Sequence, residues 1–245
     1  MFSATTEPAL SLPGFNQKTR QAGLQIYQAF TIDRTLLLAQ VPHIAMFVLG
    51  VLSGVYQEKD PRNLLISFDL IRFILTNFYQ EAHCYFDNEV QESQFAEDIY
   101  DAVACYFPIN FTPPQNDTFK VKPETLKKML SDCFTASPKL VNHFVPFLLE
   151  KLSAKQVDTK LETLDLLSEF ALKFSTYWLT DKLQSNILSI VSNLFFKDVS
   201  SQNVQPKAGR LIGLILDKMV PRDFDYSVGI KSELCQFLDR CVSDI

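Results

Sequence analysis

Apolar side chains within residues 141–174 recur at helical spacing in two runs, and a short polar link separates the runs. Both runs place apolar residues three or four positions apart, which gathers them on one face of an α-helix. The runs comprise Val141, Phe144, Val145, Leu148, Leu149 and Leu152, then Leu161, Leu164, Leu167, Phe170 and Phe174. Because residues 153–158 form only a short connection, the pattern predicts two antiparallel helices packed as a pair.

Similar helix pairs are predicted along most of the chain. They occupy residues 43–79, 92–135, 139–174 and 180–219. Their first helices begin about 49, 47 and 41 residues apart, close to the period of HEAT and armadillo repeats. Only seven glycines are present, so turns for a many-stranded sheet are scarce. We therefore predict an all-α fold, a HEAT- or armadillo-type α-solenoid that residues 1–245 form as a single segment.

Two further helices are predicted without partners, at residues 16–30 and 229–242. The first has the pattern of a second helix that lacks its first, and the other is a first helix that lacks its second. A solenoid needs polar caps at its ends. We therefore expect both ends either to continue into further repeats or to rest against another surface.

Asp60 and Pro61 mark the start of one helix. An aspartate before the first turn can accept hydrogen bonds from first-turn amides. Proline fits the first helical position, because the amide it lacks would have no partner within the helix. We predict that this pair is a structural helix cap.

A proline-rich loop at residues 107–121 is inserted between the two helices of the second pair. Its prolines push the preceding residues out of the helical region, so the loop is semi-rigid and carries apolar side chains. Those side chains either fold back onto their own repeat or dock a partner, since insertions in repeats often lie on a binding face. The candidate partner-binding residues are Phe107, Ile109, Phe111, Pro113 and Pro114.

The residues that catalysis or metal binding would need are sparse. The sequence contains no phosphate-binding glycine loop, nucleophile elbow or zinc-binding His-Glu-x-x-His helix. Its three histidines, His43, His83 and His143, fall in different units of the predicted array. Cys105 and Cys133 lie in apolar stretches and are predicted to be small core residues. We therefore expect no enzymatic activity, no catalytic or metal site and no bound cofactor.

Charge, cysteine content and apolar segments indicate which partners and which cellular compartment suit the chain. A net charge of −5 gives no general attraction to phosphate backbones, so direct binding to nucleic acid is disfavoured. Five cysteines and no recognisable secretion signal favour a reducing compartment. Residues 35–56 carry no charge and approach the length of a membrane span, but Gln40 and His43 would be costly at membrane depth. A buried solenoid helix is the favoured interpretation, and a membrane anchor is the alternative.

Three stretches of this sequence resemble the N-terminal half of the methyl-methanesulfonate-sensitivity nineteen family, in the same order and with similar spacing. The likeness is strong over about residues 45–170. The first is Glu58-Lys59-Asp60-Pro61-Arg62-Asn63-Leu64-Leu65. The second is Cys105-Tyr106-Phe107-Pro108-Ile109-Asn110-Phe111-Thr112-Pro113-Pro114, with Asn116-Asp117. The third is Pro146-Phe147-Leu148-Leu149-Glu150-Lys151-Leu152.

This resemblance implies a HEAT-repeat adaptor of cytosolic iron-sulfur protein assembly. Such an adaptor recruits client apoproteins of DNA repair, replication and transcription, among them helicases and polymerases, to the other subunits of the targeting complex that delivers the cluster. It binds proteins and not the cluster. The family's location implies cytoplasm and nucleus, with the mitotic spindle as a further site.

Family members are several times longer, and their C-terminal repeats dock the partner subunits, so we expect this chain to be a partial or short form. The alternative function is that of a HEAT-repeat scaffold of the transport or phosphatase type, with other cargo.

Overall fold

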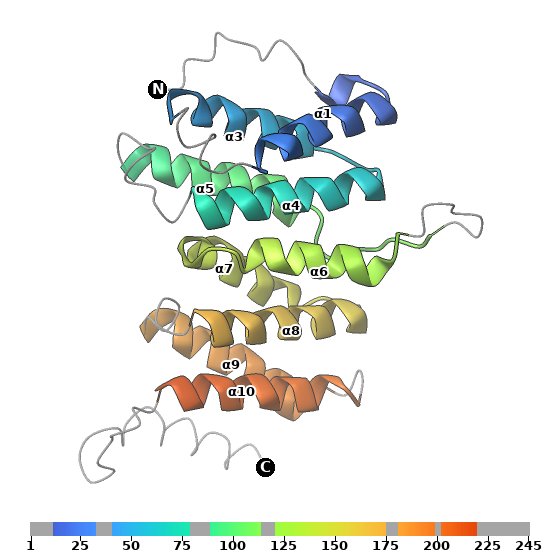
Figure 1. The fold of residues 1–245 in the computed structure, drawn as a ribbon. Helices are drawn as coiled ribbons and strands as arrows, with labels where there is room; N and C mark the ends of the chain where they lie inside the picture. The colour runs from blue at the N-terminus through green and yellow to red at the C-terminus, as the bar shows by residue number, and fades with distance from the viewer. Residues whose placement is uncertain are drawn as a thin grey trace. The chain divides into compact units, whose positions relative to one another are not determined.

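The computed structural model describes residues 12–32, 41–78, 89–113, 121–174, 181–198 and 202–219. All regular secondary structure in these ranges is helical, so the all-α prediction is confirmed there. The helices are α1 (Gln17–Phe30), α3 (Val41–Val55), α4 (Pro61–Asn77), α5 (Glu89–Ala104), α6 (Pro123–Phe134), α7 (Val141–Lys151), α8 (Val157–Lys173), α9 (Asp181–Lys197) and α10 (Val204–Met219) (Figure 1). Two short 3-10 helices, η1 (Leu12–Gly14) and η3 (Pro138–Leu140), precede α1 and α7.

The predicted helix pairs correspond to α3 with α4, α5 with α6, α7 with α8, and α9 with α10. The predicted helix at residues 16–30 corresponds to α1, whereas the one predicted at residues 229–242 lies outside the described residues. Each helix pattern depends on neighbours three or four positions away, and this spacing is readable without tertiary information.

The helices group into two compact units, Met1–Phe144 and Val145–Ile245, where the prediction had one continuous segment. The boundary falls within α7. In a repeat protein each element contacts mainly its near neighbours, so contacts can cluster into units without a change of repeat type. We call them unit 1 and unit 2.

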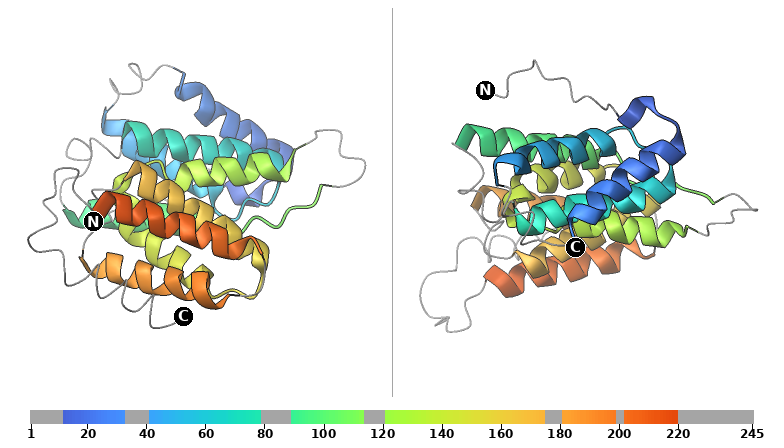
Figure 2. Two further views of the ribbon diagram at one scale, coloured as in Figure 1. Left: turned by 90° about the horizontal axis from the view of Figure 1, so that it is seen from below. Right: turned by 45° about the horizontal axis from the view of Figure 1, so that its top comes forward.

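In unit 1, α4 packs against α1, α3 and α6 (Figure 1 and Figure 2). Its buried face carries Phe68, Ile71 and Leu75, which are fully buried at helical spacing. Aromatic rings extend this core, since Phe134 of α6 stacks on Phe144 with ring centroids 4.2 Å apart. Burial of these rings together with the aliphatic side chains stabilises the unit.

In unit 2, α10 packs against both α8 and α9, and α8 and α10 lie side by side (Figure 1 and Figure 2). Leu167 and Phe170 of α8 and Leu211 of α10 are fully buried. Lys160 at the start of α8 forms an ion pair with Asp198, just after α9. Their side chains are only 12% and 7% exposed, so this pair is better shielded from solvent than a surface pair.

The apolar segment at residues 35–56 enters the described structure at Val41, within α3. Among the helices of the described ranges, none is long and apolar enough to cross a membrane. From Phe47 onward, five apolar side chains of α3 are buried in unit 1: Phe47, Val48, Val51, Leu52 and Val55.

Candidate protein-interaction sites

The first of the three resembling stretches is built around a buried carboxylate. The side chain of Glu58 is fully buried, and it accepts hydrogen bonds from Nε and Nη2 of Arg20 at 2.8 Å each. It also accepts from the amides of Lys59 and Asp60 and from Nδ2 of Asn63, at 2.8 to 2.9 Å. The charge of Glu58 is therefore compensated from α1, from its own turn and from α4.

The protonation of Glu58 reflects two opposing effects. Burial by itself raises the pKa of the carboxyl group, because the charged form loses its hydration. Hydrogen bonds from Arg20, from the Asp60 amide and from Asn63 outweigh that effect and hold the pKa below its ordinary value. Glu58 is thus a charged structural group at neutral pH and joins the turn after α3 to α1 and α4.

Asp60 is the N-cap of α4, and Pro61 occupies the first turn. Oδ1 of Asp60 accepts the amide of Arg62 at 3.0 Å, and the Arg62 guanidinium pairs with the same carboxylate. This hydrogen bonding from Arg62 lowers the pKa of Asp60. Asp60 and Pro61 are therefore structural residues that start helix α4 in unit 1.

Two anchored aromatic residues stand at the entry of the proline-rich loop, Tyr106 just before it and Phe107 as its first residue. Tyr106 packs edge-on against Phe68, with ring centroids 5.6 Å apart. Phe107 is only 7% exposed, and its ring centroid lies 5.9 Å from that of Phe134. The structure therefore places Phe107 in the core of unit 1, which is the fold-back alternative for this side chain.

The rest of the loop is more accessible. Ile109, Phe111 and Pro113 are partly exposed, so they remain candidates for contact with a partner. Pro114 lies outside the described residues. The candidate loop surface thus comprises Ile109, Phe111 and Pro113.

The two cysteines that were predicted to be buried differ. Cys133 is buried, and its thiol donates to the backbone carbonyl of Phe68 at 2.9 Å. Cys105 is exposed, so the prediction was wrong for this residue. The reason is its position immediately after the last residue of α5, where the helical stripe that buries Val103 no longer applies.

The histidines show no shared site in the part of the chain that the structure describes. His143 lies beside the ring of Tyr100, with centroids 6.0 Å apart. The side chains of His43 and His83 are outside the described set. Among the described residues, no three histidine, cysteine or acidic side chains are arranged to hold a metal ion.

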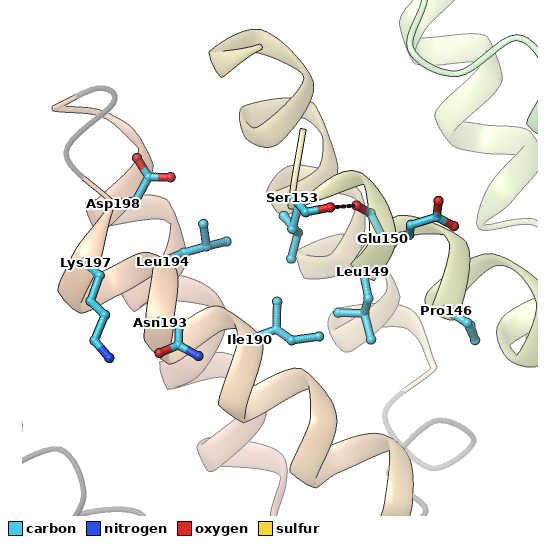
Figure 3. Close-up of a pocket in the computed structure, with 10 residues that line it drawn as sticks. Pro146, Leu149, Glu150, Ser153, Ile190, Asn193, Leu194, Lys197 and Asp198 are labelled. Carbon is cyan, nitrogen blue, oxygen red and sulfur yellow. Dashed lines mark hydrogen bonds between the residues drawn. The ribbon is translucent and has the colours of Figure 1, made fainter. Parts of the chain in front are cut away.

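A groove in unit 2 lies between α7 and α9, with a volume of about 680 Å³. Leu149 of α7 and Ile190 of α9 point toward one another across it (Figure 3). We call this the α7–α9 groove. The residues that line it are Pro146, Leu149, Glu150, Leu152, Ser153, Ile190, Asn193, Leu194, Lys197 and Asp198.

The sequence patterns did not reveal this groove. In the third resembling stretch, Leu148 and Leu152 are buried, whereas Leu149 is partly exposed and Pro146 is exposed. Pro146 and Leu149 are three residues apart, so they form a second apolar row on α7. That second row was the available signal, but only the packing of α9 shows that it borders a groove.

Comparison with known proteins adds a family and several relatives. The family model described as "Dos2-interacting transcription regulator of RNA-Pol-II", MMS19_N, matches residues 5–199. The "MMS19 nucleotide excision repair protein homolog" of Dictyostelium discoideum is 35% identical over 121 residues, which is 49% of this chain and 10% of that protein. The human protein of the same name is 30% identical over 151 residues, covering 62% of this chain and 14% of that protein.

The yeast Saccharomyces cerevisiae has a further relative, an MMS19 protein described as a "DNA repair/transcription protein". It is 36% identical over 129 residues, which is 53% of this chain and 11% of the yeast protein. The chain thus spans only about 10% to 14% of the length of these curated relatives.

Proposed function

The chain belongs to the MMS19 family, and we propose that it is a non-enzymatic adaptor in cytosolic iron-sulfur protein assembly. In this role it holds client apoproteins of DNA repair, replication and transcription for the complex that delivers the cluster. The observation that carries the proposal is the family match over residues 5–199. The names of the relatives support its repair and transcription side.

The chain spans only a small part of its relatives' length, so we propose that it performs one of the adaptor's tasks. This task is to bind client proteins, in the cytoplasm and in the nucleus. Two surfaces of the described residues could supply it, namely the loop surface of Ile109, Phe111 and Pro113 and the α7–α9 groove. When a partner covers half-buried apolar side chains, apolar surface is removed from water, and this favours binding.

Affinity purification of the tagged chain from cells, followed by mass spectrometry, tests this function. We expect co-purification of iron-sulfur assembly subunits together with cluster-carrying helicases or polymerases. A helical-repeat protein of similar length with the same tag serves as the control. Recovery of transport factors or phosphatases in place of iron-sulfur proteins would contradict the proposal.

A further inference from the structure

We propose that the α7–α9 groove binds one amphipathic helix of a partner protein, with its apolar face against Leu149, Ile190 and Leu194. This inference rests on the proposed function, because the clients of the adaptor would supply the helix.

The floor of the groove is apolar. Leu149, Ile190 and Leu194 are each partly exposed, and Leu152 is buried beneath them. In Figure 3, Leu149 and Ile190 extend into the gap from opposite walls. An apolar side chain that enters between them removes surface from water on both walls, which favours an occupant with an apolar face.

The walls of the groove favour a helix over an extended strand. Both walls belong to α-helices, whose backbone amides and carbonyls are largely paired within their own helix. They cannot offer the row of free backbone groups that a docking strand needs. A helix satisfies its own backbone groups and needs only side-chain contact, which these walls can provide.

The dimensions fit a short helical contact. The lining residues run from Pro146 to Ser153 on one wall and from Ile190 to Asp198 on the other. At 1.5 Å per residue each wall is roughly 11–12 Å long, which equals about two helical turns. The volume of about 680 Å³ leaves room for the apolar side chains that two turns would insert.

Charge at the edges of the groove gives the helix a preferred orientation. Glu150 lies on the α7 wall and Lys197 on the α9 wall, and both side chains are exposed and make no ion pair with any described residue. In Figure 3, the Glu150 carboxylate lies at the upper right beyond the α7 wall, and the Lys197 side chain runs downward from the α9 wall at the left. A helix with a basic residue along the Glu150 edge and an acidic residue along the Lys197 edge would be complementary, and the exchanged arrangement would place like charges together.

Contacts within unit 2 hold the α9 wall of the groove in place. Asp198 at its end is already engaged by Lys160 of α8, in an ion pair that is mostly shielded from solvent. The close packing of α10 on both α8 and α9 supports the α9 wall. Binding would therefore require little rearrangement of the walls, which preserves affinity.

The test uses a synthetic peptide of about 14 residues, locked as a helix by a hydrocarbon staple on its outer face. It carries leucines at positions i, i+4 and i+7, with lysine along one edge of this stripe and glutamate along the other. A second peptide has the lysine and glutamate exchanged. Binding to the whole chain is measured by fluorescence anisotropy.

We expect the matched peptide to bind the wild-type chain and Ile190→Glu to weaken this binding about tenfold or more. The control is Ile26→Glu in unit 1, at a residue that is 59% exposed and distant in sequence from the groove, and binding should be unchanged. The double variant Glu150→Lys with Lys197→Glu should reverse the preference between the two peptides. Circular dichroism of each variant verifies that it is folded.

If Ile190→Glu does not fold, the double charge variant decides the question alone, because its changes lie on exposed edges. Equal binding of the peptides to wild type and variants, or no binding, overturns the groove proposal. Capture of the same iron-sulfur partners by Ile190→Glu and by wild type also overturns it but leaves the adaptor function standing. Loss of those partners from the wild-type chain itself contradicts the adaptor function, whatever the peptide does.

Discussion

The hydroxyl of Tyr106 donates a hydrogen bond to the backbone carbonyl of Val55 at 2.7 Å, across 51 residues of chain. Val55 is the last residue of α3, and Tyr106 lies just before the proline-rich loop. Burial raises the pKa of the Tyr106 phenol, so the hydroxyl keeps its proton and remains a donor at neutral pH. This bond ties the entry of the loop to the first helix of the preceding pair.

Substitution Tyr106→Phe should lower the free energy of unfolding by about 1 kcal/mol, because it removes one partly buried hydrogen bond and keeps the ring. The Val55 carbonyl would still accept the amide of Glu58, which limits the loss. Urea denaturation of the whole chain measures the change. Tyr56→Phe is the matched control, since Tyr56 is 52% exposed and its hydroxyl should matter little. Equal stabilities of the two variants would contradict this role of the bond.

Substitution Arg20→Ala should cost about 2–3 kcal/mol of stability, because it leaves the fully buried Glu58 carboxylate without its two charged hydrogen bonds. The control is Arg72→Ala, which removes an ion pair with Asp69 between side chains that are 48% and 34% exposed. Such a pair contributes about 0–1 kcal/mol. Thermal unfolding of both variants compares the two, and a smaller effect at Arg20 than at Arg72 would be inconsistent with the structure.

The stability of unit 1 should fall in acid partly through Glu58. The folded protein holds the pKa of Glu58 below its ordinary value of 4.5, so the unfolded chain takes up the proton first. The contribution of this group is therefore complete above about pH 5 and is lost as the pH falls through the folded pKa. Wild type should lose more stability between pH 6 and pH 4 than Glu58→Gln, as measured by urea midpoints at each pH. Equal losses of stability in wild type and Glu58→Gln over this pH range would show that Glu58 is not the group responsible.

Substitutions in the loop surface should weaken partner binding and leave the fold intact. The double variant Ile109→Ser with Phe111→Ser should reduce recovery of iron-sulfur partners in affinity purification and leave helix content unchanged, since both side chains are partly exposed. Phe107→Ser is the structural control, because this 7% exposed ring belongs to the core and its loss should destabilise the chain by about 3 kcal/mol. Undiminished recovery with the double variant would reject the loop as a docking element.

Much of the helical framework could be read from the sequence, because it depends on neighbours only a few residues apart. The stripe that begins at Val141 lies on α7, and Asp60 with Pro61 begins α4, as their chemistry requires. Spacing of three and four residues, and the fit of proline to a first turn, act within one or two helical turns.

The candidate sites were less accessible to such reasoning. Phe107 and Ile109 are both apolar members of one loop, yet the structure buries the first and leaves the second partly exposed. Cys105 and Cys133 are likewise equivalent by composition, and only Cys133 is buried. In each case the outcome depends on which ring or helix from elsewhere in the chain covers the side chain.

The sequence by itself determined an all-α chain with capped, amphipathic helices, because these properties arise from short-range periodicity and backbone chemistry. Only the tertiary structure decided that Arg20 neutralises Glu58 from 38 positions away, and that Leu149 faces Ile190 across a groove. Contacts between residues so far apart depend on how whole helices pack, and local patterns carry no information on that packing.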